Sequence, residues 1–147
     1  MRDRPLPVLL GYESRDDFLT RRLGWYYPTL QSLSAELPQG AVVLFLWEPR
    51  SYHCRGEIEC RPDALLDRWL HATHLYGMDA SAIATSWRKQ GVTHVLLHRL
   101  GYEAIRAAQF DPLTQADQDT LAILQRDSMK KVKDFGEAYV LYTLQSP

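Results

Sequence analysis

Two short apolar runs stand out in the pattern of hydrophobic and polar positions along the chain. Residues 40–47 are almost continuously apolar, rich in β-branched and aromatic side chains, and bounded on both sides by proline. Residues 93–99 form a second run of the same kind, with a histidine near each end. Runs of this length and composition predict strands that are buried on both faces, as at the centre of an α/β sheet.

Most of the remaining chain has apolar residues at helical spacing. Ser14 is a typical N-cap, and Gly24 is expected to separate two helices before residue 37. Further helices are expected over residues 62–76, 79–90 (with Asp79 or Ser81 as cap), 101–109 and 114–132, the last with a capping box formed by Thr114 and Asp117. Residues 5–10 are expected to form an edge strand, and residues 138–144 a last strand.

The order of these elements predicts the fold class. A strand followed by helices and a second strand usually places the two strands parallel, with a right-handed crossover. We therefore expect a single three-layer, Rossmann-like α/β domain over residues 1–147. Its small, mostly parallel sheet is expected to be built on residues 41–48, 93–99 and 138–144.

Composition excludes some classes of function. The chain has 147 residues, a formal net charge of -1 and 46% hydrophobic residues, which is typical of one globular domain. The densest basic cluster, residues 130–133, is only one helical turn long, so a nucleic-acid partner is not expected. No apolar stretch approaches the roughly 18 residues of a membrane span, and residues 1–10 do not resemble a signal peptide.

Cofactor and metal motifs are also missing from the sequence. There is no glycine-rich dinucleotide or phosphate loop after either apolar run, so no cofactor is expected. His71 and His74 share one helix face but lack the glutamate and the spacing of a zincin. His94 and His98 would lie roughly 13 Å apart along a strand, too far to share one ion. No metal site is expected.

The two cysteines leave two interpretations open. Cys54 and Cys60 flank a segment with Gly56, and a turn there could bring them within disulfide range. A disulfide would indicate an oxidising compartment, whereas two free thiols would fit a cytosol. A zinc site with His53 lacks a fourth ligand and the tight Cys-x-x-Cys spacing.

One cluster of candidate site residues follows from topology. Glu48 and Arg50 leave the first predicted strand, and His98 and Arg99 leave the second. If the strands are parallel neighbours, all four lie at one sheet edge, where a carboxylate, two guanidinium groups and an imidazole could bind an anionic or sugar-like group. The alternative is a salt-bridge network that holds the loops, with Glu48 neutralised by an arginine.

Three segments carry a resemblance to a known family. Residues 13–19, 37–52 and 91–98 together resemble the soluble C-terminal region of bacterial polytopic membrane glycosyltransferases of the dolichyl-phosphate-mannose–protein mannosyltransferase type. The resemblance implies an extracytoplasmic fragment of a larger membrane protein, with the membrane-embedded remainder as its partner. That family's catalytic carboxylates lie in loops between membrane helices, so no catalytic residue is transferred to this chain. The implied role is accessory, as a domain that binds glycan or acceptor.

Two other classes of function remain open at this stage. The chain could be a free-standing small-molecule-binding protein or enzyme that uses the cluster at the strand ends. It could also be a structural or oligomerisation module, for which exposed Trp25, Tyr26 and Tyr27 would form a dimer patch. Packing of these aromatic residues in the core is the simpler interpretation.

Overall fold

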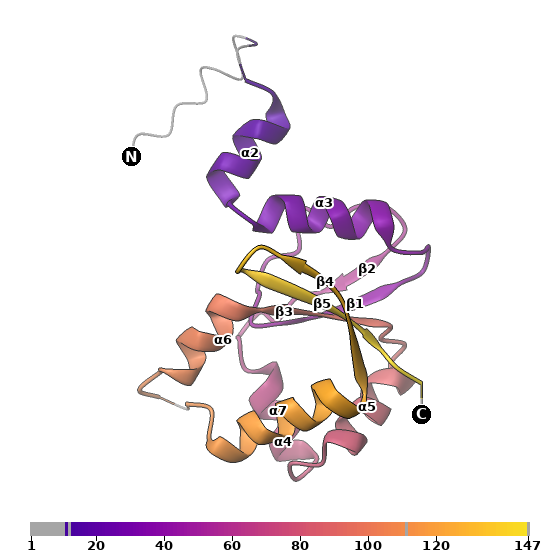
Figure 1. Cartoon of the computed structure of the whole chain (residues 1–147), viewed down its shortest axis with the longest axis vertical. Coiled ribbons are helices and arrows are strands. Elements are labelled where there is room, and N and C mark those ends of the chain that lie inside the picture. The colour runs from indigo at the N-terminus through magenta and orange to yellow at the C-terminus, as the bar shows by residue number, and fades with distance from the viewer. Residues whose placement is uncertain (1–10, 12, 111, 147) are drawn as a thin grey trace.

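The chain folds into a mixed α/β arrangement around one sheet. The computed structural model describes residues 11, 13–110 and 112–146 (Figure 1). Its strands are β1 (Val42–Leu46), β2 (Glu59–Arg61), β3 (His94–His98), β4 (Met129–Phe135) and β5 (Tyr139–Leu144). They form a five-stranded sheet in the order β2-β1-β3-β5-β4.

The sheet has a parallel half and an antiparallel half. β1 runs parallel to both β2 and β3, which confirms that the two apolar runs are parallel neighbours. β5 runs antiparallel to both β3 and β4, so the expectation of a mostly parallel sheet was wrong. The reason is the tight turn at Gly136, where a left-handed φ of 55° lets β5 return directly beside β4.

The helices lie on both faces of this sheet. Within the described residues they are α2 (Arg15–Leu23), α3 (Tyr26–Glu36), α4 (Arg68–Leu75), α5 (Ala80–Lys89), α6 (Arg99–Arg106) and α7 (Gln115–Asp127). α3 lies against one face, and α4, α5 and α7 lie against the other (Figure 1). The predicted caps are confirmed, because the side chains of Ser14, Asp79 and Thr114 each accept a hydrogen bond from the first turn of their helix.

Alternation along the central strands divides the core into two parts. Val43 and Phe45 of β1 face α3, whereas Leu44 and Leu46 face α4 and α5. This is the pattern expected when a strand is covered on both sides. The side opposite α3 also holds the large residues Trp69 and Trp87, whose rings pack at a centroid distance of 6.2 Å.

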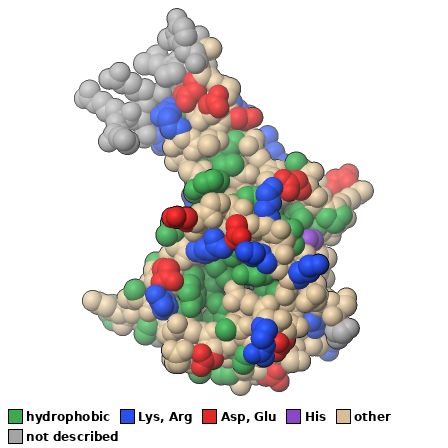
Figure 2. Space-filling model, viewed as in Figure 1, with side chains coloured by type: hydrophobic (Ala, Val, Ile, Leu, Met, Phe, Trp, Pro, Cys, Tyr) green, Lys and Arg blue, Asp and Glu red, His purple; other side chains and the backbone are tan. Residues whose placement is uncertain are grey.

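The C-terminal part of the chain differs from the sequence prediction. The last long helix ends at Asp127, and residues 129–135 form β4 instead of a helical extension to residue 132. β4 is an edge strand with exposed lysines, and an irregularity between Lys131 and Lys133 interrupts its alternation. Lysine and arginine side chains lie among aspartates and glutamates on the face of the molecule seen in Figure 2. Edge strands often carry charged side chains because the charges prevent pairing with strands of other molecules. In the sequence, the lysines of β4 look like the basic last turn of a helix, which explains the wrong prediction.

The other differences from the sequence prediction are small and concern where helices and strands begin. α4 begins at Arg68 and not near residue 62, and the short strand β2 was not foreseen. α6 begins two residues before the expected position. The edge strand expected over residues 5–10 lies outside the described residues.

The three consecutive aromatic residues near the start of α3 do not form a common exposed patch. Tyr26 and Tyr27 are buried, which confirms core packing for these two, and the alternative of a dimer patch made of all three was wrong. Trp25 is 53% exposed, and its indole ring lies so close to Gly136 that a Cβ atom there would clash with it. Residue 136 in the β4–β5 turn must therefore be a glycine, because any side chain there would collide with the Trp25 ring.

Candidate functional site

The chain makes an unusual turn immediately after β1. Trp47 has a left-handed φ of 59°, a backbone conformation that bulky residues rarely adopt. Its N–H donates to Asp63 Oδ2 at 2.9 Å, and His98 Nδ1 lies 3.0 Å from its carbonyl oxygen. Because a carbonyl oxygen only accepts, the Nδ1 atom carries the hydrogen in this contact. These contacts hold the turn that directs Glu48 into the protein.

The Glu48 carboxylate is fully buried and fully hydrogen-bonded. Its side chain is 0% exposed, and Arg50 grips it with two guanidinium contacts, Nε to Oε1 at 2.7 Å and Nη2 to Oε2 at 2.9 Å. The Arg50 backbone N–H also donates to Oε1 at 3.0 Å, and the Tyr139 hydroxyl donates to Oε2. This is the two-pronged geometry in which arginine binds carboxylates most strongly.

Aromatic rings surround this ion pair. The His98 ring stacks on the Tyr139 ring at a centroid distance of 4.6 Å, and its Nδ1 lies 3.7 Å from Glu48 Oε2. On the other side, the Arg50 guanidinium lies over the Tyr26 ring at 4.1 Å from its centroid. The Glu48 carboxylate is thus enclosed between β5, the end of β3 and the first turn of α3, whereas the Arg50 side chain is 35% exposed.

The electrostatics agree with a stable ion pair. Burial alone would raise the pKa of Glu48, but the hydrogen bonds from Arg50 and Tyr139 outweigh it and hold that pKa below its ordinary value of 4.5. Hydrogen bonding to Glu48 raises the pKa of Arg50, and burial together with the Glu48 contact raises the pKa of Tyr139. Both members of the pair are therefore charged at neutral pH.

Arg99 lies apart from the other three predicted site residues. Its guanidinium donates to the Gly136 carbonyl at 3.1 Å and pairs with Asp134, so it holds the β4–β5 turn. The structure brings together Glu48, Arg50 and His98 but directs Arg99 elsewhere. The physical reason is the antiparallel hairpin beside β3, which supplies Arg99 with a carboxylate that the sequence did not place there.

The arrangement at the strand ends has the character of a structural network. Arg50 and Tyr139 occupy both carboxylate oxygens of Glu48. In the described part of the chain, no serine, threonine or cysteine side chain hydrogen-bonds to Glu48, Arg50 or His98. The Arg68 guanidinium has a structural role as well, at the ends of β1 and β2. It donates to the carbonyl oxygens of Phe45, Arg61 and Pro62, each at 2.8 Å. Ligand binding by Glu48, Arg50, His98 and Arg99 stays a prediction.

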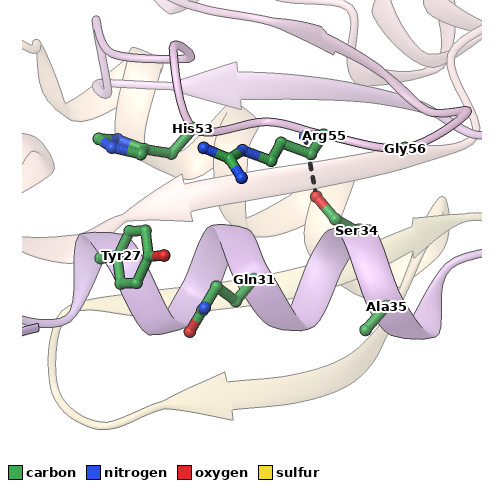
Figure 3. A pocket seen from close by; sticks show the side chains of 7 residues that line it. All are labelled: Tyr27, Gln31, Ser34, Ala35, His53, Arg55 and Gly56. Atoms are coloured by element: carbon green, nitrogen blue, oxygen red, sulfur yellow. Dashed lines mark hydrogen bonds between the residues drawn. The ribbon is translucent and has the colours of Figure 1, made fainter. Parts of the chain in front are cut away.

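A cleft that was not found from the sequence lies on the α3 side of the sheet, beside the loop of the two cysteines. Cys54 and Cys60 form a disulfide, which closes the loop between β1 and β2. This loop lies along α3, with a cleft between them that is lined by Tyr27, Gln31, Ser34, Ala35, His53, Arg55 and Gly56 (Figure 3). The spacing of the two cysteines is the sequence signal that could have indicated this cleft, because a disulfide between them fixes the loop residues that line it.

The histidines on α4 do not form a metal centre. His71 and His74 line a hollow of about 590 Å³ together with Asp67 and Asp117. Asp117 is buried and already accepts hydrogen bonds from Thr114 and Thr73. Among the described residues, no group of three or more metal-binding side chains is arranged to hold an ion.

Membrane-spanning segments and similarity to known proteins are two further properties that could identify the class of protein. No helix in residues 11, 13–110 and 112–146 combines the length and the apolar character needed to cross a membrane. Neither a protein-family model nor a curated protein sequence matches the chain.

Proposed function

We propose that this chain is a non-catalytic, extracytoplasmic accessory domain of a membrane glycosyltransferase, and that it binds glycan or acceptor for its membrane-embedded partner. The membrane enzyme in this proposal comes from the resemblance of residues 13–19, 37–52 and 91–98. The non-catalytic role comes from the geometry at the strand ends. A single observation carries that part of the proposal.

That observation is the closed ion pair of Glu48 and Arg50. A general acid or base must be within reach of substrate and must change its protonation state near the working pH. Glu48 has no exposed surface, and Arg50 and Tyr139 hold its pKa below the ordinary value after burial is taken into account. These properties suit a structural anchor that holds the turn after β1, and they favour recognition over catalysis.

The disulfide supports an extracytoplasmic location. Cys54 and Cys60 are bonded, and no other cysteine occurs in the chain. Disulfides persist in oxidising compartments and are rare in a reducing cytosol. The bond lies in the loop that lines the cleft, so the compartment and the shape of the cleft are linked in this proposal.

The proposal also includes the finer fold assignment, a three-layer Rossmann-like domain. Its support is the unit β1–β2–α4–α5–β3, in which β1 is parallel to both β2 and β3 and two helices precede β3. The helices found on both faces of the sheet add to this support. The antiparallel β4–β5 hairpin would then be an addition at one edge.

The gene and the thiols test the proposal together. The reading frame upstream of the Met1 codon is expected to encode several apolar segments of membrane-spanning length. Thiol titration of the denatured, unreduced protein, taken from its native compartment, is expected to find no free thiol. A stop codon upstream, or two titratable thiols per chain, would contradict the proposal.

The accessory role needs an activity measurement on the whole gene product. In membranes that contain it, removal of this domain is expected to raise the KM for acceptor while sugar transfer at saturating acceptor continues. Loss of all transfer with a correctly inserted membrane part would assign chemistry to this domain. A domain deletion that leaves the KM unchanged would remove the binding role.

A further inference from the structure

The cleft between α3 and the disulfide loop has the dimensions of a small-molecule site. Its volume is about 400 Å³, within the range of ligand pockets. Tyr27, Gln31 and Ser34 follow one another on one face of α3, and the loop faces them with His53 and Arg55 (Figure 3). The walls therefore come from two segments that are far apart in the sequence.

Several contacts fix the loop against the helix. The Arg55 backbone N–H donates to Ser34 Oγ at 3.0 Å, and a Cβ atom on Gly56 would lie 3.4 Å from the Ser34 carbonyl oxygen. The His53 ring packs edge-on against the Tyr27 ring at a centroid distance of 5.1 Å. With the disulfide closing the loop at its base, the cleft is preformed, so a ligand would not need to order it.

Three polar side chains of the cleft, those of His53, Arg55 and Gln31, lack hydrogen-bond partners among the described residues. His53 Nδ1 is buried, and no group in the described part of the chain hydrogen-bonds to it. In residues 11, 13–110 and 112–146, neither an ion pair nor a hydrogen bond engages the Arg55 guanidinium or the Gln31 amide. Buried polar atoms are normally satisfied, so the buried, unpartnered His53 Nδ1 indicates that an external group completes the site. The Arg55 guanidinium and the Gln31 amide beside it are exposed and can reach such a group.

The charge in the cleft is positive. Burial lowers the pKa of His53, and the charges of Arg55 and Arg15 lower it further, so this imidazole is neutral at pH 7. The nearby carboxylate of Asp16 accepts a hydrogen bond from the Tyr27 hydroxyl at 2.7 Å. Arg55 is then left as an available cation for an anionic group.

We propose that this cleft binds a monosaccharide that carries a phosphate or carboxylate group. The Arg55 guanidinium holds the anion, and His53 and Gln31 hydrogen-bond to the sugar hydroxyls. A neutral imidazole and a carboxamide each donate and accept, as hydroxyl groups do. The volume equals that of about a dozen water molecules in the liquid, more than an isolated phosphate fills. The choice of a sugar rests on the proposed function, whereas the anion site rests on the geometry alone.

Titrations of the complete 147-residue chain followed by NMR of backbone amides test this site. The probes are glucose 1-phosphate and glucuronate, compared with neutral glucose and with inorganic phosphate at equal ionic strength. The charged sugars are expected to shift the amides of Gln31, Arg55 and Gly56. Arg55→Gln is expected to weaken their binding about ten-fold or more, because it removes a charge-assisted contact.

Two further variants keep the test independent of folding. Gln31→Ala, on the exposed side of α3, is expected to weaken binding of the charged sugars while the spectrum of the free protein changes only near residue 31. Arg106→Gln removes an equal charge from α6, where Arg106 pairs with Glu103, and is expected to leave binding unchanged.

Three results would overturn the inference. They are the absence of shifts with either charged sugar, equally tight binding of inorganic phosphate or neutral glucose, and equal weakening by Arg106→Gln. Charged-sugar binding by a gene product without membrane segments would keep this site and remove the proposed function. A gene product with membrane segments whose cleft binds neither charged sugar would keep the proposed function and remove this site.

Discussion

Replacing Arg50 with alanine should destabilise the fold strongly, because it leaves the Glu48 carboxylate buried without its cation. Removing one partner of a buried ion pair costs about 3–5 kcal/mol. We expect the lower end, about 3 kcal/mol at pH 7, because the backbone N–H of residue 50 and the Tyr139 hydroxyl still donate to the carboxylate. A loss of this size is a large fraction of the stability of a single domain.

The pH dependence of this loss gives the sharper test. In the natural protein the folded-state pKa of Glu48 is lowered, so its contribution to stability is present above the unfolded-state pKa and is lost as pH falls through the folded-state pKa. In the Arg50→Ala variant burial dominates and raises that pKa. Stability of the variant then falls as pH rises above the unfolded-state pKa, so the difference from the natural protein should be smaller near pH 4 than at pH 7.

Urea unfolding followed by tryptophan fluorescence measures both effects, since Trp47 and Trp69 are buried. The matched control is Arg61→Ala, which also removes an arginine from a strand end. Arg61 pairs with Glu59, whose side chain is 57% exposed, so its loss should be much smaller and nearly independent of pH. Equal losses in the two variants, or a pH-independent loss for Arg50→Ala, would refute the reasoning. Adding Glu48→Gln to Arg50→Ala should restore part of the stability at pH 7.

Three other perturbations have definite expected outcomes. Gly101→Ala should lower the urea midpoint markedly, because its Cβ would lie 2.4 Å from the Trp47 carbonyl oxygen; a midpoint equal to that of the natural protein would contradict this close approach. Reducing the Cys54–Cys60 bond should lower the free energy of unfolding by about 2 kcal/mol, estimated from the small closed loop, and equal thermal midpoints with and without reductant would contradict it. Thr114→Ala should cost about 1 kcal/mol by removing the cap of α7, with a smaller cost for Thr114→Gly; the reverse order would exclude a capping role.

The central strands and helix caps could be predicted from the sequence because each depends on local signals. Residues 42–46 and 95–97 are apolar on both faces. Ser14 and Thr114 precede carboxylates at the spacing that caps require. β4 could not be predicted this way. Its conformation is set by pairing with β5, and its exposed lysines carry no apolar period.

In the candidate site, too, some features could be predicted from the sequence and others depend on tertiary contacts. The sequence placed Glu48, Arg50 and His98 at one sheet edge because they leave parallel neighbours. It could not assign Arg99, whose partner Asp134 is supplied by the hairpin. It also could not show that the loop containing His53 lies over α3, because that contact depends on the disulfide and on tertiary packing.

The disulfide also has a consequence for association between molecules. Cys60 lies in β2, opposite Val43 of β1, and β2 contributes only three residues to the outer edge of the sheet. The bond to Cys54 joins β2 to the preceding loop and limits how far this short strand can leave β1. If β2 separates from β1 after reduction, the apolar strand β1 becomes the border of the sheet, with free backbone groups that can pair with a strand from another chain. We therefore expect the bond between Cys54 and Cys60 to oppose self-assembly through the sheet edge.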